Sequence, residues 1–282
     1  MQAEEKLFDL SGLTILLTGA SGHLGRALAH GLARAGARLV LSSRTLASAS
    51  AIADELPAPS APSAPSAPSP PSAPSGTPPS ATQHLATQID HLDPDSVQQG
   101  FERAVAEAGT LDVLIANGHQ PSASDWTSVS DAEFNQQLQN ATGYFMLARR
   151  LREHVVSRSA SGNVIFLGSM YGLVGSYPDA YAGIGPASPV AYHALKGGVI
   201  QMTRHLAVYW AADKVRVNCL SPGPFPAPTV APGLVEKLSG HSPMGRMGRA
   251  EELVGPAVFL ASHASSYVTG HNLVVDGGWT AW

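Results

Sequence analysis

The chain has 282 residues, of which 44% are hydrophobic, so it can bury a substantial core without disulfides or a structural metal. Its formal net charge is −4, with 17 Lys and Arg against 21 Asp and Glu, which argues against nucleic acid as a partner. The single cysteine excludes an internal disulfide framework, and the 11 histidines form no HExxH motif or Cys/His cluster, so we expect no metal site. The sequence shows neither a basic and apolar leader nor an apolar run of about 18 residues, so we expect a cytoplasmic protein that does not use the membrane.

Short apolar runs alternate along the chain with segments that repeat Leu and Ala at helical spacing. The apolar runs predict strands at residues 13–18, 38–41, 85–89, 111–116, 163–167, 216–220 and 272–275. The helical spacing predicts helices at residues 24–35, 46–56, 95–108, 134–152 and 192–211. Strands without a polar face indicate a parallel sheet that is covered on both sides. We therefore predict a single α/β domain over residues 1–282, with the doubly wound, Rossmann-type αβα sandwich.

Residues 57–83 interrupt this pattern with repeats of Ala, Pro and Ser and contain no Val, Ile, Leu or aromatic residue. Proline at this density fixes φ and removes backbone donors, so we expect a disordered insertion within the domain. The alternative is a ligand for a Pro-binding module, but the repeat lacks flanking Arg or aromatic anchors.

A glycine-rich segment, TGASGHLG, follows the first predicted strand and leads directly into a predicted helix. Its three glycines permit a tight turn, a close approach of the backbone to a pyrophosphate and close packing of the helix on the strand. The helix N-terminus adds free N–H groups and a positive dipole. A P-loop is excluded because no Gly-Lys-Ser/Thr follows, and a simple turn is the alternative. We predict a dinucleotide site whose loop residues are Gly19, Ser21, Gly22, His23, Leu24 and Gly25.

The end of the second predicted strand indicates which dinucleotide fits. A loop that prefers NAD usually has an acidic residue about 20 positions after its glycines, where the carboxylate binds the ribose 2′-hydroxyl. Here the segment reads Ser-Ser-Arg-Thr and carries no carboxylate. The guanidinium of Arg44 can bind a 2′-phosphate through two N–H groups, so we predict NADP(H) in preference to NAD(H). The alternative is that Arg44 is a solvated loop residue.

Tyr192 and Lys196 carry the second chemical signal. They stand four residues apart in a predicted helix, so both side chains lie on one face. The ammonium then favours ionisation of the phenol and lowers its pKa, which makes Tyr192 a usable acid or base near neutral pH. An ordinary pair on the surface of a helix is the alternative.

With these motifs, the sequence resembles the single-domain short-chain dehydrogenases/reductases over nearly all of its length apart from the insertion. Further motifs occur in the family's order, namely Asp90, Asn117-Gly118, Asn140, Ser169, Ser221-Pro222-Gly223 and Val274-Val-Asp-Gly-Gly278. The resemblance is greatest to members of the gluconate 5-dehydrogenase and 3-oxoacyl reductase type. It implies the Rossmann-type fold and an alcohol dehydrogenase or carbonyl reductase that uses a nicotinamide cofactor.

The resemblance implies a catalytic set of Asn140, Ser169, Tyr192 and Lys196. Tyr192 would protonate a carbonyl oxygen during reduction, or take the alcohol proton during oxidation. Lys196 would lower the pKa of Tyr192 and hydrogen-bond the nicotinamide ribose. Ser169 would hydrogen-bond the substrate oxygen, and Asn140 would hold a water that connects Lys196 to solvent.

The resemblance also implies cofactor contacts outside the glycine loop. It places Asp90 and His91 at the adenine end, although Asp90 is alternatively a simple turn residue. It places Pro222 and Gly223 at the nicotinamide end. The remaining contacts that it implies are Asn117, Gly118, Tyr192 and Lys196.

The C-terminal segment resembles the sheet edge through which members of the family associate. It comprises residues 274–278 and the aromatic residues Trp279 and Trp282. Exposed aromatic side chains are unfavourable on a monomer, so we expect Trp279 and Trp282 to lie in an interface. We therefore expect a homotetramer or a homodimer.

Three features depart from the family pattern. The glycines are spaced G-x-x-G-x-x-G, as in the family's longer epimerases and dehydratases, and the usual Asn-Asn-Ala-Gly is Ala-Asn-Gly-His at residues 116–119. Ser169 and Tyr192 are also further apart than is usual in the family. We expect the long loop between them to lie near the substrate, because it is bracketed by catalytic residues. Its tyrosines are Tyr171, Tyr177 and Tyr181.

The resulting hypothesis is an NADP(H)-dependent enzyme that interconverts a small secondary alcohol and its ketone, or an aldehyde and its alcohol. Sugar-type dehydrogenases of the family have a similar long loop and C-terminal segment, which favours a polar hydroxy or keto substrate. An enoyl reductase is disfavoured because it would need a longer separation between Tyr and Lys, and residue 189 is Pro. The alternative from another class is a dinucleotide-binding regulator or scaffold without turnover.

Overall fold

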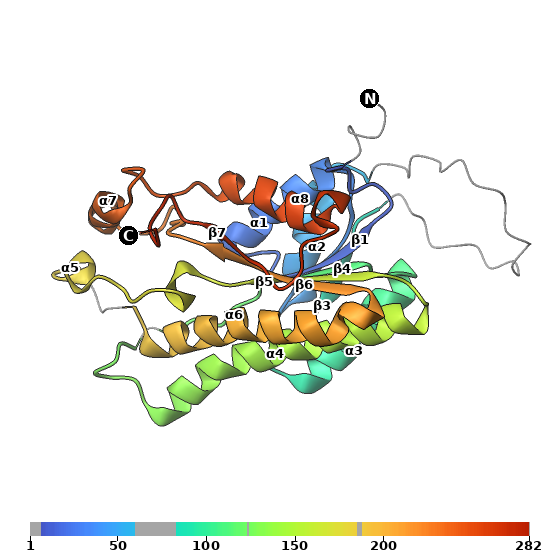
Figure 1. The fold of residues 1–282 in the computed structure, drawn as a ribbon, viewed down its shortest axis with the longest axis horizontal. Coiled ribbons are helices and arrows are strands. Elements are labelled where there is room, and N and C mark those ends of the chain that lie inside the picture. Colours follow the sequence, from blue (N-terminus) through green and yellow to red (C-terminus); the bar gives the residue numbers. More distant parts are fainter. Residues whose placement is uncertain (1–6, 60–82, 123, 185–187, 282) are drawn as a thin grey trace, which may run out of the picture.

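The chain forms one parallel sheet with helices on both faces, in a computed structural model that describes residues 7–59, 83–122, 124–184 and 188–281 (Figure 1). The strands are β1 (Thr14–Thr18), β2 (Arg38–Ser43), β3 (Leu85–Gln88), β4 (Val113–Ala116), β5 (Gly162–Leu167), β6 (Val215–Pro222) and β7 (Asn272–Val275). The helices are α1 (His23–Arg34), α2 (Leu46–Glu55), α3 (Pro94–Ala108), α4 (Asp131–Ser157), α5 (Pro178–Tyr181), α6 (Val190–Trp210), α7 (Pro232–His241) and α8 (Val254–Ala261). Short 3-10 helices lie at Met170–Gly172, Ala211–Asp213, Ala250–Leu253 and His263–Ser265.

The structure confirms the doubly wound parallel fold, with its seven predicted strands and five predicted helices. Helix α4 begins three residues earlier than predicted because Ser130 and Glu133 form a capping box, in which each side chain bonds the other residue's backbone N–H. Helix α3 begins at a proline, after Asp93 has capped the N–H of Asp95. Helices α5, α7 and α8 are additional to those predicted.

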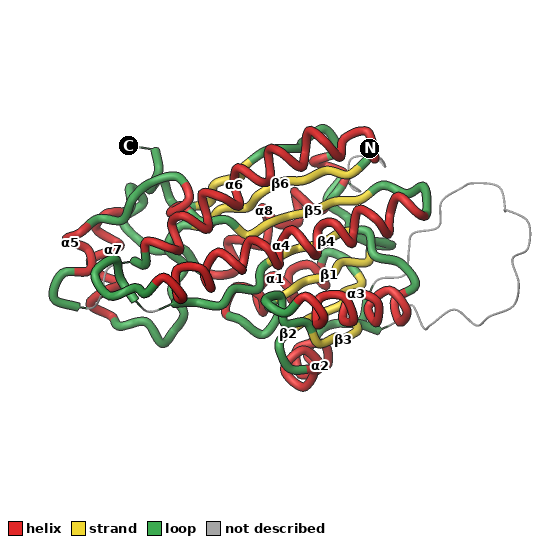
Figure 2. The backbone as a smooth tube through the Cα atoms, turned by 90° about the horizontal axis from the view of Figure 1, so that it is seen from below, coloured by secondary structure: helices red, strands yellow, loops and turns green. Residues whose placement is uncertain are grey.

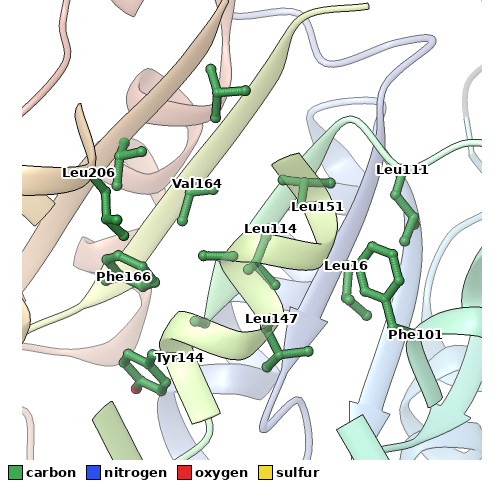
Figure 3. Close-up of a cluster of buried hydrophobic side chains, with 14 of the residues drawn as sticks. Leu16, Phe101, Leu111, Leu114, Tyr144, Leu147, Leu151, Val164, Phe166 and Leu206 are labelled. Atoms are coloured by element: carbon green, nitrogen blue, oxygen red, sulfur yellow. The ribbon is translucent and has the colours of Figure 1, made fainter. Parts of the chain in front are cut away.

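The sheet separates two hydrophobic layers. Helices α3, α4 and α6 cover one face, whereas α1 and α8 cover the other (Figures 1 and 2). In the first layer, Phe101 of α3 and Leu147 of α4 pack against buried strand residues such as Leu114 (Figure 3). Burial of large apolar side chains of this kind stabilises the fold by about 1.5–3 kcal/mol each. The sheet is therefore a rigid support for the loops at its carboxyl edge.

The sheet order β3-β2-β1-β4-β5-β6-β7 reverses direction between β1 and β4. The helix that follows β1 lies on one face of the sheet, and α4, which follows β4, lies on the other. Open parallel sheets bind ligands in the crevice at such a reversal, beside the carboxyl ends of the strands. The glycine loop follows β1, and Asn117 follows β4, so both motifs meet at this crevice.

The predicted insertion leaves and re-enters the domain at neighbouring points. Residues 60–82, which form most of it, lie outside the described residues. At its two ends, His84 Nε2 lies 2.8 Å from the carbonyl oxygen of Pro57, and Arg38 Nε donates to the carbonyl oxygen of Gln83 at 3.2 Å. These contacts hold both ends of the insertion beside the start of β2.

The expectation for Trp279 is wrong. Its side chain is only 1% exposed within the single chain, and its ring lies 5.4 Å from that of Tyr177 and 5.9 Å from that of His241. Trp279 is therefore buried by α7 and by the loop before α5, and needs no second chain to cover it. Trp282, which shared the expectation, lies outside the described residues.

Candidate active site

Two cavities of about 410 Å³ each lie side by side at the crevice. The glycine-loop cavity is lined by residues such as Gly19, Gly22, Arg44, His91 and Asn117. The tyrosine cavity is lined by residues such as Ser169, Tyr171, Tyr181, Tyr192 and Leu238. His119 and Phe225 line both cavities, so a ligand in one can reach a ligand in the other.

The glycine loop leaves no space for side chains at its close contacts. Gly19 has φ +64°, and a Cβ there would lie 2.7 Å from Gly118 Cα. At Gly25, a Cβ would collide with the carbonyl oxygen of Gly19. Asn117 Nδ2 fixes the loop by donating to the carbonyl oxygens of Thr18 and Gly19. The backbone of the glycine loop, without side chains at these glycines, therefore forms this part of the cavity wall.

The N-terminus of α1 is suited to an anion. Gly22 is its N-cap and provides no side-chain hydrogen bond, and the first turn carries no acidic residue. The first N–H groups of the helix therefore have no intrahelical or side-chain acceptor, and they face a cavity lined by Gly22, His23 and Leu24. Free N–H groups and the helix dipole together bind phosphate, so these residues fit the pyrophosphate of a dinucleotide.

Tyr192 and Lys196 lie on one face of α6, as predicted from their spacing. Lys196 is 4% exposed, and its Nζ lies 5.5 Å from the ring centre of Tyr192. The same Nζ donates to the carbonyl oxygen of Leu167, at the end of β5, with a length of 2.7 Å. Burial lowers the pKa of Lys196 to about 8. The ammonium is therefore held beneath the phenol and not in the open cavity.

The pKa of Tyr192 differs from the predicted direction. Burial raises it above the ordinary value, and a hydrogen bond with Ser169 opposes this rise. The spacing alone predicted that Lys196 would lower this pKa, but burial of the phenol is the largest influence on it and raises it. Tyr192 therefore stays protonated at neutral pH, with its hydroxyl beside Ser169, where it can donate a proton.

Asn140 has a different environment from the one implied by the resemblance. Its Oδ1 accepts hydrogen bonds from the N–H of Gln120 and from Nε2 of His91, each at 2.8 Å. Its Nδ2 donates to the carbonyl oxygen of Gln137 at 2.9 Å. Through these bonds the Asn140 side chain fixes the loop that carries His119. Because the side chain is occupied, a water would have to contact another atom of Asn140.

Comparison with known proteins identifies the family. A family model described as enoyl-(acyl carrier protein) reductase matches residues 77–280. Galactitol 2-dehydrogenase (L-tagatose-forming) of Cereibacter sphaeroides is 34% identical over 282 residues, with 98% of both chains covered. Gluconate 5-dehydrogenase of Gluconobacter oxydans is 31% identical, with 97% of both chains covered. The crystal structure of a gluconate 5-dehydrogenase from Burkholderia cenocepacia, in complex with NADP and tartrate, has a TM-score of 0.79, 25% identity and 98% coverage of both chains.

The chain belongs to the short-chain dehydrogenase/reductase family. Its curated relatives are named as dehydrogenases and reductases of alcohols and keto compounds, so an oxidoreductase is the function class of this chain. The expectation of this family from the sequence is confirmed.

The two residues that the family resemblance placed at the adenine end have different surroundings. His91 lines the glycine-loop cavity, with its ring also bonded to Asn140. Asp90 does not line this cavity, and its Oδ1 accepts from the N–H of Leu92. Asp90 therefore stabilises the turn that leads to α3, and its contact with the adenine end stays a prediction.

Arg44 lies at the exposed rim of the glycine-loop cavity, at the end of β2. Its Nη1 donates to Gln120 Oε1 at 2.8 Å, and beside it Ser43 Oγ donates to Ser21 Oγ at 2.9 Å. Ser43 and Arg44 thus present a hydroxyl and a guanidinium to the cavity, and the segment 42–45 carries no carboxylate. This donor set fits a phosphate on the adenosine ribose.

The backbone at Gly223 lies close to that of Asp276, beside the tyrosine cavity. A Cβ at this residue would lie 2.6 Å from Asp276 Cα, and its N–H donates to the carbonyl oxygen of Val275. Its predecessor, Pro222, ends β6. Gly223 lines the tyrosine cavity, whereas Pro222 is buried in the sheet behind it.

The long loop after Ser169 contributes two of its three tyrosines to the tyrosine cavity. Tyr171 and Tyr181 line it, and their hydroxyls are 2.8 Å apart. Tyr177 instead stacks on His241 of α7, with ring centres 4.4 Å apart. Helices α5 and α7 lie together beyond one end of the sheet (Figures 1 and 2) and form the outer wall of the site.

His119 is one of the site residues that the sequence did not predict. Its ring meets that of Tyr192 at a centre-to-centre distance of 5.2 Å, and its Nδ1 has no hydrogen-bond partner among the described residues. Burial, together with the charge of Lys196, lowers its pKa to about 3, so the imidazole is neutral at physiological pH. The available signal was that His119 stands at the position of the last residue, glycine, of the family's usual Asn-Asn-Ala-Gly.

The described residues contain no helix that is long and apolar enough to cross a membrane. Within the same part of the chain, no three His, Cys, Asp or Glu side chains gather in a way that could hold a metal ion.

Proposed function

We propose that the protein is an NADP(H)-dependent oxidoreductase that interconverts a secondary alcohol and its ketone, with a substrate of the polyol or keto-sugar type. The observation that carries this proposal is the pair of hydroxyls of Ser169 and Tyr192 in a cavity that shares a wall with the glycine-loop cavity. The names of the relatives support the substrate type, since galactitol 2-dehydrogenase and gluconate 5-dehydrogenase act at a secondary carbon of a polyhydroxylated chain.

The chain's own residues would position the substrate and handle its proton. The Ser169 hydroxyl lies beside the Tyr192 phenol, so both can bond the oxygen of a ketone in the tyrosine cavity. Because the phenol is protonated at neutral pH, Tyr192 can donate its proton to that oxygen as negative charge develops there. When bound, NADP(H) supplies or accepts the hydride.

Lys196 would support this proton transfer from below. Its ammonium lies 5.5 Å from the phenol ring, in a buried site where charges interact more strongly than in water. As Tyr192 gives up its proton, the positive charge stabilises the phenolate that forms. In the oxidative direction the phenolate takes the alcohol proton, and the same charge favours its formation beforehand.

The glycine-loop cavity would hold the cofactor, with its pyrophosphate on the N-terminus of α1. NADP(H) in preference to NAD(H) is proposed because Arg44 stands at the rim and segment 42–45 carries no carboxylate. One solved relative was crystallised with NADP, which is compatible with this preference.

We also propose that the protein acts in the cytoplasm as a homotetramer or homodimer. The single cysteine, Cys219, is buried and unpaired. The edge strand β7 is only half-buried, and Val208 and Tyr209 on α6 are 76% and 68% exposed. Light scattering on the purified protein would report the number of chains, and cell fractionation would report the compartment.

The test of the proposed function is the Tyr192→Phe variant. We expect it to lose more than about 100-fold in kcat with a keto-sugar substrate, because it lacks the proton donor. Binding of NADPH, followed by its fluorescence, should be retained. Near-full turnover by the variant would contradict the mechanism. Binding of NADPH by the unaltered protein without turnover on any ketone or aldehyde would favour the regulator or scaffold.

A further inference from the structure

The tyrosine cavity has an uncharged wall. None of the described residues that line it is Lys, Arg, Asp or Glu. Residues 123 and 185–187, which lie outside the described residues, are Ala and Gly-Pro-Ala and carry no charged side chain. Its hydrogen-bonding groups come from side chains of Ser, Gln, Tyr and His, and the rest of the lining is apolar or Gly.

Three basic side chains on the segments around this cavity, those of Lys196, Lys237 and Arg246, have partners outside it. Lys196 Nζ bonds the carbonyl oxygen of Leu167 behind Tyr192. Lys237 Nζ donates to the carbonyl oxygen of Ala182 at 2.6 Å, on the outside of α7. The two terminal nitrogens of Arg246 each lie 2.7 Å from a carboxylate oxygen of Glu252. None of these three cations lines the tyrosine cavity, so a carboxylate there would have no direct ion-pair partner among them.

Two buried polar atoms of the same cavity have no partner among the described residues. One is Nδ1 of His119, a neutral imidazole. The other is Oε1 of Gln137, whose side chain is 1% exposed. The orientation of this amide follows from its Nε2, which donates to the carbonyl oxygen of Gln120 at 2.8 Å. A buried acceptor such as Oε1 requires a donor, which a hydroxyl provides and a carboxylate does not.

We infer that the substrate is uncharged: a polyol or ketose whose hydroxyl groups bond to Gln137 and His119, and not a sugar acid. This inference rests on the proposed function and narrows its substrate class. Burying a carboxylate without a cation or a full set of donors is strongly unfavourable, whereas hydroxyls satisfy both orphan atoms. The apolar part of the lining can then pack against the carbon chain.

Matched pairs of ketones test this inference. L-Sorbose and 5-keto-D-gluconate differ only by a hydroxymethyl group in place of a carboxylate. The methyl ester of 4-oxocyclohexanecarboxylate and the free acid form a second pair, and ethyl acetoacetate with acetoacetate a third. We expect kcat/KM with NADPH to be at least about tenfold higher for the uncharged member of each pair that reacts. The same order should appear in titrations of the compounds into the protein saturated with oxidised NADP.

The outcomes separate this inference from the proposed function. Turnover or binding that favours the carboxylate members would overturn the uncharged substrate and leave the oxidoreductase intact. If none of the three pairs reacts or binds, the proposed secondary-alcohol function fails, and the inference that rests on it fails too.

A charge-introducing variant sharpens the test. Val230 lines the tyrosine cavity from the loop before α7. We expect Val230→Arg to raise kcat/KM for 5-keto-D-gluconate relative to L-sorbose by about tenfold, because it adds the missing cation. Val230→Met, of similar length without charge, should leave the ratio unchanged. An equal shift in both variants would contradict the electrostatic explanation.

A second variant tests the role of the orphan acceptor. Gln137→Met removes Oε1 and keeps the length of the side chain. We expect KM for L-sorbose to rise about tenfold, whereas KM for the methyl ester of 4-oxocyclohexanecarboxylate, which has no hydroxyl, should stay near its original value. An equal rise for both ketones would indicate a structural role of Gln137 and would count against its contact with substrate hydroxyls.

Discussion

The imidazole of His119 meets the phenol of Tyr192 nearly edge-on, with ring centres 5.2 Å apart and ring planes at 67°. The contact joins the loop after β4 to α6, at the wall that the two cavities share. Because the pKa of His119 is lowered to about 3, this contact involves a neutral ring and does not change between pH 5 and 8. His119 therefore does not act as a titrating acid or base in this pH range.

Substitution of His119 should change substrate binding more than the proton chemistry. We expect His119→Ala to raise KM for a hydroxylated ketone by about tenfold, because a buried hydrogen-bonding partner is lost. His119→Gln, which keeps a neutral polar group, should retain most of the affinity. The measurement is a KM and kcat comparison of both variants between pH 5 and 8. If the pH profile of the unaltered protein shows an ionisation between pH 5 and 8 and His119→Gln removes it, the neutral state of the imidazole is contradicted.

The pH dependence of ketone reduction should follow Lys196. Its pKa is lowered to about 8 by burial, so its positive charge is present below that pH and is lost above it. Burial raises the pKa values of Tyr192 and Tyr144, and that of Cys219 to about 11, so these neighbours stay protonated around pH 8. Reduction needs the protonated phenol and the charged ammonium together. We therefore expect kcat/KM for reduction to be level near neutral pH and to fall as the pH rises through about 8.

This profile is measured with NADPH and an uncharged ketone whose own protonation does not change. A rate of reduction that increases above pH 8 would show that Lys196 does not have to be charged. Oxidation of the alcohol should respond in the opposite direction near neutrality, because it needs the phenolate, which forms more readily as the pH rises.

The elements with strong periodicity or adjacent chemistry were predictable from the sequence. The strands and the five long helices follow from apolar runs and helical spacing, and the Tyr192–Lys196 pair follows from a spacing of four on one face. Helix α8, by contrast, is apolar on most sides and only eight residues long, so it shows little periodicity. Helix α7 contains two glycines and a proline, which weaken the signal further.

Other features depend on tertiary contacts that no local pattern records. Burial among side chains such as Tyr171 and Leu238 raises the pKa of Tyr192, a direction that its spacing from Lys196 does not predict. Trp279 is buried by Tyr177 and His241, which are far from it in sequence. His119 belongs to the site because the side chain of Asn140 fixes its loop. Such contacts between segments that are distant in the sequence form only once the sheet has brought those segments together.

Arg44 should control the choice of cofactor. We expect Arg44→Ala to raise KM for NADPH by at least about tenfold, because the 2′-phosphate loses its charged hydrogen bonds, and to leave KM for NADH nearly unchanged. Gln120→Ala is the matched control, since it removes the partner of Arg44 Nη1 but keeps the guanidinium. The ratio of initial rates with the two cofactors gives the result. Preference of the unaltered protein for NADH would contradict the assignment of NADP(H).

Removal of the predicted insertion should leave the enzyme largely unchanged. Because His84 bonds the carbonyl oxygen of Pro57, the two ends of the insertion are already close together, and a short linker can join them. We expect a variant in which Gly-Ser-Gly replaces residues 60–82 to keep its Tm within about 3 °C, since the entropic cost of a loop depends only weakly on its length. Its kcat/KM should also stay within about twofold of the original. A control with the additional substitution His84→Ala should have a lower Tm, because the bond between the two ends is lost. A large loss of Tm or activity in the deletion variant alone would show that residues 60–82 pack on the domain or gate the site.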